Sequence, residues 1–245
     1  LNDGRAFFYD DNGVMSGYVT GDVSFVGIDG LTVSSRMTLR YNAATSAVSE
    51  SAIVAGDTIE LEFSADEVGD GTTPFIQFVA EDVAIDLGVV MALGGDLTLT
   101  RAPGTFNVLA TDAYAFIGDG PYLRSDGSVN AEAGGVAISN VDLAMFIDTD
   151  SEGGDYAVYA SGDAVLLGVD SVTLGGNLNA WANTTGTQTI DFGGTGGEID
   201  LGTTSDVYAF AGNDVVFSVS DFVSISGSVS LQYGDDGVTA IGEDI

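Results

Sequence analysis

Four stretches of this chain carry the same pattern, in which every second residue over about twenty positions is apolar or glycine, with few exceptions. The stretches run from Val23 to Tyr41, from Val83 to Leu99, from Ala164 to Ala182 and from Val215 to Tyr233. A period of two residues is typical of β-strands with one buried face, and no stretch sustains the 3.6-residue period of an amphipathic helix. Because the pattern recurs, it predicts a fold assembled from one unit that is used again.

An aspartate precedes each of the four sets, and the spacing shows that the sets recur in pairs. The aspartates are Asp22, Asp82, Asp163 and Asp214. The first and third sets match at an offset of 141 residues, where Asn42 corresponds to Asn183, and the second and fourth match at an offset of 132. We therefore expect a first full repeat pair in residues 1–150 and a second, truncated pair in residues 151–245, in one continuous stack. Since the chain starts and stops in mid-pattern, we expect it to be an excerpt of a longer array.

The length of each set restricts the architecture. Twenty residues exceed a usual strand of about 3–10 residues, so each set has to turn or bend. In a hairpin with a two-residue loop, residue i pairs with residue i+3, so the apolar residues would change from odd to even numbers, or the reverse, across the turn. In each of the four sets the apolar residues keep the same odd or even numbering throughout. We therefore predict an all-β, elongated repeat architecture, a β-solenoid-like stack of short strands whose side chains keep pointing inward at the corners. The alternative is a series of tandem antiparallel β-sandwich modules with bent or bulged strands.

The charge balance excludes several classes of partner. The chain has 5 basic residues, all arginine, against 37 acidic ones, for a formal net charge of −32. Such a surface repels nucleic acids and anionic lipids, so we expect neither as a partner. No apolar run approaches the roughly 20 residues of a membrane helix, so no membrane insertion is expected. The charge indicates either a surface adapted to salt or a requirement for bound cations.

The residue types leave little room for catalysis. Cysteine, histidine and lysine are absent, which excludes disulfides, thiolate metal sites, Ser-His-Asp triads and Schiff-base chemistry. A carboxylate pair of a polysaccharide hydrolase or lyase remains. The glutamates best placed for it, Glu60 and Glu62, alternate with apolar neighbours, as on an ordinary solvent face. We therefore predict that the chain is not an enzyme, and a carboxylate-based hydrolase or lyase is the least favoured function.

One acidic segment resembles the first half of a calcium-binding loop. Carboxylates at alternate positions followed by glycine would converge on one ion, because the glycine permits a sharp turn. The candidate ligands are Asp148, Asp150, Glu152 and Asp155. The twelfth position of such a loop, which calls for glutamate, is Tyr159. The segment is thus either a calcium site or a solvated acidic turn, and calcium is the candidate cofactor.

The remaining marked positions have structural interpretations. Tyr9–Gly13 and Gly234–Gly237 are shorter acidic segments of the same kind, and their Asn-Gly and Asp-Gly pairs favour turns over calcium sites. Three aspartates within the apolar sets mark exposed corners or are bonded to backbone amides, with a ligand role as the third alternative: Asp29, Asp170 and Asp221. The repeated Gly-Asp pairs at 21–22 and 162–163 are expected to set corners. Trp181 either packs against a neighbouring coil or stacks on a sugar.

The segments Gly162–Leu178 and Asp221–Leu231 resemble repeats of giant secreted bacterial proteins, some of which are grouped as LEPR-XLL-type surface proteins with adhesin-like arrays. The resemblance covers most of the chain. It implies an extracellular or cell-surface location, a much longer polypeptide, and a stalk, filament or adhesive role. It implies no catalytic residue.

We therefore expect a structural or adhesive repeat module of a very large extracellular bacterial protein. Its partners would be neighbouring copies or repeats of the same protein, with surface glycans as a further class. The alternative is a calcium-dependent module that binds carbohydrate or a surface.

Overall fold

A computed structural model describes residues 2–25, 32–86, 91–124, 126–152, 154–191, 198–220, 222–234 and 237–243. All regular structure in these residues is β-strand, which confirms the all-β prediction. In chain order the strands are β1 (Asn2–Asp11), β2 (Val14–Phe25), β3 (Thr32–Asn42), β4 (Val48–Val54), β5 (Asp57–Phe63), β6 (Phe75–Asp86), β7 (Met91–Ala102), β8 (Thr105–Asp119), β9 (Gly134–Asp148), β10 (Tyr156–Leu167), β11 (Val172–Asn183), β12 (Thr189–Asp191), β13 (Glu198–Asp200), β14 (Val207–Val219), β15 (Val223–Gly234) and β16 (Gly237–Glu243).

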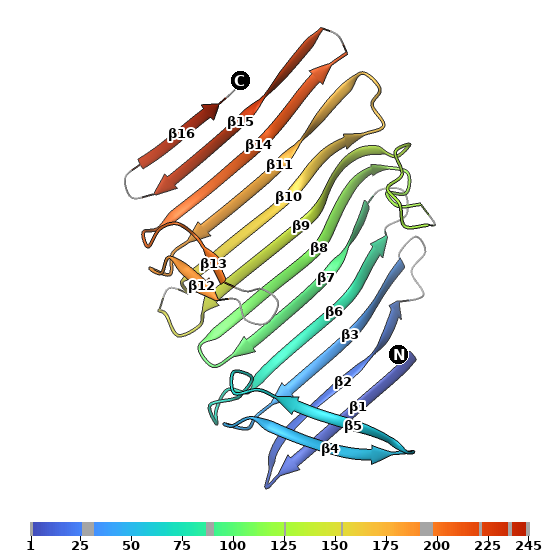
Figure 1. Ribbon diagram of the computed structural model, residues 1–245, viewed down its shortest axis with the longest axis vertical. Helices are drawn as coiled ribbons and strands as arrows, with labels where there is room; N and C mark the ends of the chain where they lie inside the picture. Colours follow the sequence, from blue (N-terminus) through green and yellow to red (C-terminus); the bar gives the residue numbers. More distant parts are fainter. Residues whose placement is uncertain are drawn as a thin grey trace.

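Twelve of these strands form one antiparallel sheet that follows the order of the chain (Figure 1). Each strand pairs with the next, except where a hairpin is inserted. The β4–β5 hairpin is inserted between β3 and β6, and the β12–β13 hairpin between β11 and β14. β1 and β16 are the outermost strands, so the first and last strands lie on opposite edges of the sheet.

The corners of the four apolar sets are hairpins, and this corrects the argument from parity. The first set crosses from β2 to β3, where Phe25 pairs with Val33. The third crosses from β10 to β11, where Ala164 pairs with Gly176. In both pairs the two residue numbers are both odd or both even, so an odd number of residues lies between the partners. A hairpin of this kind keeps the apolar residues on one face without a change from odd to even numbers. The described strands contain no solenoid coil, and a sandwich built on this sheet is compatible with them.

The register sorts side chains onto two faces. One row of directly paired residues crosses ten strands: Met37, Ala80, Leu97, Ala110, Leu143, Ala160, Ala180, Phe210, Leu231 and Ala240. We call the face that carries this row the apolar face. The opposite face, which carries Phe75, Phe116, Ala157 and Val207, is here called the covered face. These four side chains are at most 3% exposed, so bulky side chains are deeply buried on the covered face, whereas the buried Ala80 of the apolar face is small.

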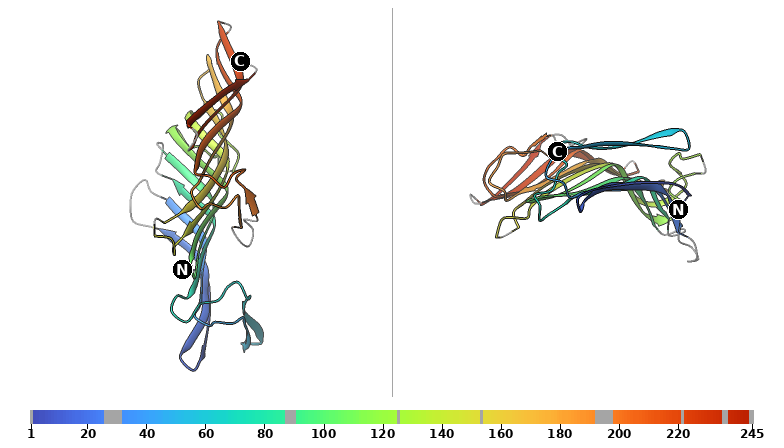
Figure 2. Two further views of the ribbon diagram at one scale, coloured as in Figure 1. Left: turned by 90° about the vertical axis from the view of Figure 1, so that its left-hand side faces the viewer. Right: turned by 90° about the horizontal axis from the view of Figure 1, so that it is seen from below.

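Three segments outside the sheet supply the cover. The β4–β5 hairpin places Leu61 and Phe63 against Phe75 of the sheet. Residues 120–133 contribute Tyr122, whose ring stacks on that of Phe116 at a centroid distance of 5.3 Å. The β12–β13 hairpin adds a third cluster, in which Ile190 and Leu201 pack on Ala144 and Ala157. Figure 2 shows both inserted hairpins on the same side of a single-layer, twisted sheet.

A row of β-bulges crosses the sheet near the middle of its strands. The bulged residues have positive φ angles of 48–51°: Asp3, Asp82, Asp112, Asn140 and Asp214. Aspartate and asparagine tolerate this left-handed conformation better than most residues do. Asp22 and Asp163 lie within strands beside this row, so the prediction that the Gly-Asp pairs set corners was wrong. The aspartates that precede the four sets belong instead to the line where the sheet bends and twists more strongly.

Candidate functional site

The four predicted calcium ligands lie in and beside the turn between β9 and β10. Asp148 ends β9, and its Oδ1 accepts hydrogen bonds from the backbone N–H of Asp150 at 2.9 Å and of Ser151 at 3.2 Å. The Ser151 hydroxyl in turn accepts the N–H of Asp155 at 2.6 Å. These bonds are those of an Asx turn, which shapes the connection between β9 and β10.

The side chains of this turn differ in exposure. Asp150 and Glu152 are exposed, whereas Asp148 and Asp155 are half-buried, and Gly153 lies outside the described residues. Within the described ranges, no group of three or more His, Cys, Asp or Glu side chains is placed so that it could hold a metal ion. Calcium binding at this turn therefore stays a prediction.

Acidic side chains gather along the bulges on the covered face. By register, Glu81 and Asp82 of β6 lie opposite Asp96 of β7, whose carboxylate accepts the Asp82 N–H at 2.8 Å. At one end of the row, Arg36 Nη1 donates to Asp22 Oδ1 at 2.8 Å. The bulged backbone at Asp82 is therefore held by a neighbouring carboxylate as well as by the strand ladder.

Asp163 is the most fully bonded carboxylate of this row. Asn140 Nδ2 donates to its Oδ2 at 2.8 Å, and Asn177 Nδ2 donates to its Oδ1 at 3.2 Å. These two hydrogen bonds hold the pKa of Asp163 below its ordinary value. Its carboxylate therefore stays ionised at neutral pH and cross-links β9 and β11 through β10.

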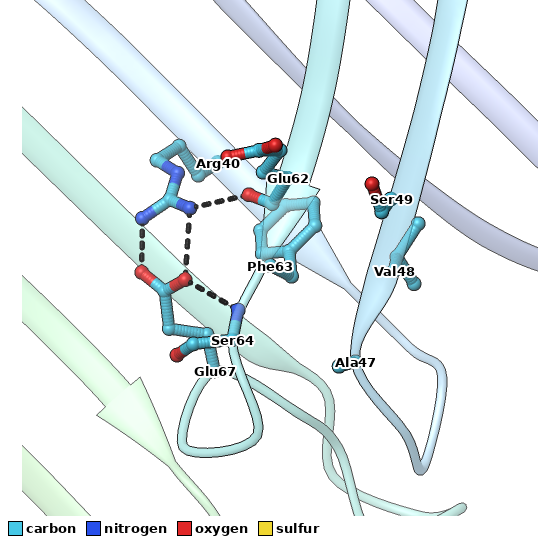
Figure 3. A pocket seen from close by; sticks show the side chains of 8 residues that line it. All are labelled: Arg40, Ala47, Val48, Ser49, Glu62, Phe63, Ser64 and Glu67. Atoms are coloured by element: carbon cyan, nitrogen blue, oxygen red, sulfur yellow. Dashed lines mark hydrogen bonds and ion pairs between the residues drawn. The ribbon is translucent and has the colours of Figure 1, made fainter.

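A cavity lies where the β4–β5 hairpin meets the sheet (Figure 3). It has a volume of about 390 Å³, is open to solvent and is lined by Arg40, Phe63, Glu67 and residues 47–49, among others. The Arg40 guanidinium lies over the Phe63 ring, 4.8 Å from its centroid. Its Nη1 and Nη2 donate to the two Glu67 carboxylate oxygens, and Nη2 also donates to the Glu62 carbonyl at 2.9 Å.

This ion pair is partly shielded from water, with side-chain exposures of 23% and 24%. Burial raises the pKa of Glu67, but the hydrogen bonds and charge of Arg40 and the N–H of Ser64 outweigh burial, so the pKa lies below its ordinary value. Nη1 also donates to Gln77 Oε1 at 2.9 Å. Both terminal nitrogens of Arg40 are thus occupied by protein acceptors, and the arrangement is that of a clamp that fixes the inserted hairpin.

Matching asparagines hold the two insertions at equivalent positions. Asn42 at the end of β3 is 0% exposed; its Nδ2 donates to the Glu67 carbonyl at 2.7 Å, and its Oδ1 accepts the Ala44 N–H at 3.0 Å. Asn183 at the end of β11 is also 0% exposed; its Nδ2 donates to the Thr187 carbonyl at 2.7 Å, and its Oδ1 accepts the Thr185 N–H at 3.0 Å. The two repeat pairs therefore share one device for anchoring an insertion.

The position equivalent to Arg40 in the second pair is Trp181, at the same offset of 141 residues. Its ring packs in the cluster formed with Ile190 and Leu201 of the second insertion and with Tyr159 of β10. Trp181 therefore packs within the chain, but against an inserted hairpin rather than against the neighbouring coil that was predicted. One insertion is clamped by an ion pair and the other by an aromatic side chain.

Other predicted positions have ordinary surroundings. Glu60 and Glu62 are exposed on β5, while Leu61 between them is 1% exposed, which confirms the solvent-face interpretation. Asn12 and Gly13 form the two-residue turn between β1 and β2, with φ angles of 55° and 91°. Asp170 is exposed in the β10–β11 turn, as expected of a corner. Three predicted positions lie outside the described residues: Asp29, Asp221 and Asp236.

The anchoring roles of Arg40 and of the two asparagines were not predicted from the sequence. The match of Asn42 with Asn183 is a signal that could have identified the anchor, because a polar residue kept at the end of a repeated apolar set has to satisfy its amide. No such signal exists for Arg40, since its partner Glu67 lies in the insertion and has no counterpart in the repeat.

No protein-family model, curated protein or solved structure matches this chain. The described residues contain no helix long and apolar enough to cross a membrane.

Proposed function

We propose that this chain is a structural repeat module of an extended extracellular bacterial assembly, such as a stalk or filament, and that it carries no catalysis. One observation carries the proposal: both repeat pairs contribute to one sheet in chain order and repeat its bulges and its buried asparagine anchors. A unit of this kind can be added strand after strand, as in other arrays whose repeats contact only their neighbours.

The form of the sheet supports an elongated arrangement. Each outer strand, β1 and β16, is paired on one side only among the described strands, so further strands of a repeat could pair with either edge. Elongation in this proposal proceeds by strand addition at the edges. The acidic, lysine-free surface supports an environment with abundant salt or cations. The resemblance to repeats of secreted bacterial surface proteins supports the location.

Small-angle scattering and electron microscopy test the proposal. A compact chain of this length would have a radius of gyration of about 18 Å. We expect a clearly larger value for this chain, and particles elongated across the strands. A longer polypeptide with further copies of the repeat pair should lengthen along the same axis by a constant increment. Compact, isolated particles with no axial repeat would contradict the proposal.

A further inference from the structure

The apolar face of the sheet carries none of the three covering segments that the structure describes. Among the described residues, all three covering segments pack on the opposite face. Large side chains of the apolar face are consequently left in water: Leu39 is 47% exposed, Ile117 66%, Leu174 39% and Leu231 46%. Contiguous apolar patches of this extent on a protein surface mark a contact with another apolar surface.

Charge is almost absent from this face. By register, its charged residues within the described strands are Asp10, Arg101 and Asp119, each at or near the end of a strand. The carboxylates of the middle of the sheet, such as Asp96 and Asp163, point to the covered face. A second chain could therefore approach the apolar face without bringing the carboxylates of the two covered faces together, despite the net charge of −32 on each chain.

The apolar face has both ridges and grooves. β9 is a ridge of large side chains, which include Val141, Leu143 and Met145. The strands on either side of this ridge carry small side chains next to it, Ala110 and Ala113 on β8 and Ala160 and Ala164 on β10. A further dent of about 170 Å³ lies over Gly227 between Phe217 and Val229. A face that carries both a ridge and adjoining grooves can fit a copy of itself across a twofold axis.

The exposed area is of the size that such a contact requires. The chain exposes 14185 Å², whereas a compact monomer of its 25.0 kDa would expose about 10,000 Å². The single-layer sheet therefore leaves roughly 4,000 Å² more in water than a compact fold does. Covering half of this excess on each of two chains would bury about 4,000 Å², which lies within the range of obligate homodimers.

We propose that the apolar face binds the apolar face of a second copy of this chain, so that two single-layer sheets form the two layers of a β-sandwich. The ridge of β9 in one copy lies in a groove beside β9 in the other. This inference goes beyond the proposed function, because it depends only on the surface of the sheet and holds whether or not the copies also elongate at their edges.

Sedimentation equilibrium at about 0.5 M NaCl, where electrostatic repulsion is screened, measures the association. The matched variants are Leu174→Glu on the apolar face and Thr173→Glu beside it on the covered face; both residues are exposed in the single chain. A second variant, Ala160→Leu, fills a groove without adding charge. We expect the wild type and Thr173→Glu to have twice the chain mass, and the dissociation constants of Leu174→Glu and Ala160→Leu to rise at least 100-fold. Circular dichroism should be the same for all four proteins.

Three outcomes would overturn the proposal. The wild type could be monomeric at about 100 µM, a concentration at which even weak dimers form. Leu174→Glu and Ala160→Leu could dimerise as tightly as Thr173→Glu does. Open-ended oligomers that are unaffected by either face variant would instead assign the association to the sheet edges. A negative result would not bear on the proposed function, because the elongated shape of the single chain is tested separately by scattering.

Discussion

Replacing Asn42 with alanine should release the β4–β5 insertion and lower the free energy of unfolding by about 3 kcal/mol. The Asn42 amide makes three hydrogen bonds in a fully buried position. Its Nδ2 donates to the Glu67 carbonyl, and its Oδ1 accepts the Ala44 N–H and the Ser16 hydroxyl, the last at 2.7 Å. Ser16 is itself 1% exposed, so its hydroxyl would be left buried without this acceptor.

The magnitude follows from these three bonds. A typical hydrogen bond contributes about 1 kcal/mol net, and a buried group left without its partner costs roughly 1–3 kcal/mol. One buried hydroxyl and two backbone groups lose their partner, which places the expected loss between about 2 and 4 kcal/mol. Asn183→Ala should cost a similar amount, because that amide bonds to Thr185, Thr187 and Thr203. Asn213→Ala, at an exposed position on β14, should change stability by less than about 0.5 kcal/mol.

Urea unfolding followed by circular dichroism measures all three variants, and the fluorescence of Trp181 separates the two anchors. Trp181 is the sole tryptophan of the chain and packs against the second insertion. We expect a red-shifted native emission for Asn183→Ala and an unchanged native emission for Asn42→Ala. Wild-type stability in both anchor variants, or an equal loss in Asn213→Ala, would refute the reasoning that these asparagines hold the insertions.

Four further predictions concern the clamp, the bulges, the charge of the chain and calcium. Because the folded-state pKa of Glu67 lies below the usual value of about 4.3, its ion pair stabilises the fold above that pH and is lost as the pH falls through the lowered pKa. Unfolding measured against pH should therefore show a steeper loss of stability in acid for the wild type than for Glu67→Gln; parallel curves would contradict the clamp. At the bulge, where Asp82 has a φ of 51°, Asp82→Val should lower stability by about 1–2 kcal/mol and Asp82→Gly by less, and equal effects would show that the left-handed backbone is not what selects this residue. Raising NaCl from about 20 to about 500 mM should raise the melting temperature, because screening weakens the repulsion among 37 acidic residues. If the turn binds calcium, the melting temperature should be higher in CaCl₂ than in NaCl of equal ionic strength, and the difference should be lost when Asp150→Asn and Glu152→Gln are combined. Identical melting temperatures in the two salts would refute calcium binding.

The strands could be predicted because one face of each is apolar for its whole length. The third set, Ala164–Ala182, became the β10–β11 hairpin, and its alternation survives in the structure residue by residue. The solenoid prediction assumed two-residue hairpin loops, whereas an odd number of residues separates the paired partners in these hairpins. The alternating pattern does not reveal how many residues of a glycine-rich segment belong to the loop. A hairpin with an odd number of residues between its partners therefore has the same sequence pattern as a solenoid corner.

The anchors could be predicted only in part. The equivalence of Asn42 and Asn183 is visible in the sequence, but a repeated position does not reveal whether its side chain is buried. Arg40 and Trp181 occupy equivalent positions but differ in chemistry. An alignment of the two repeat pairs therefore does not indicate that both residues hold an insertion. The segments that they hold, 43–74 and 184–206, interrupt the pattern and carry no sequence signal of the face on which they pack.

The order of the strands has a mechanical consequence. Because consecutive strands are neighbours and the chain enters at one edge and leaves at the other, tension applied to the two ends acts across the strands rather than along them. Such a load breaks the hydrogen bonds of an outer strand one after another, in the unzipping geometry, instead of breaking all the bonds between two strands at once. A fibre of this design would lengthen under force by peeling, releasing one hairpin at a time, and could recover by re-pairing when the load is removed.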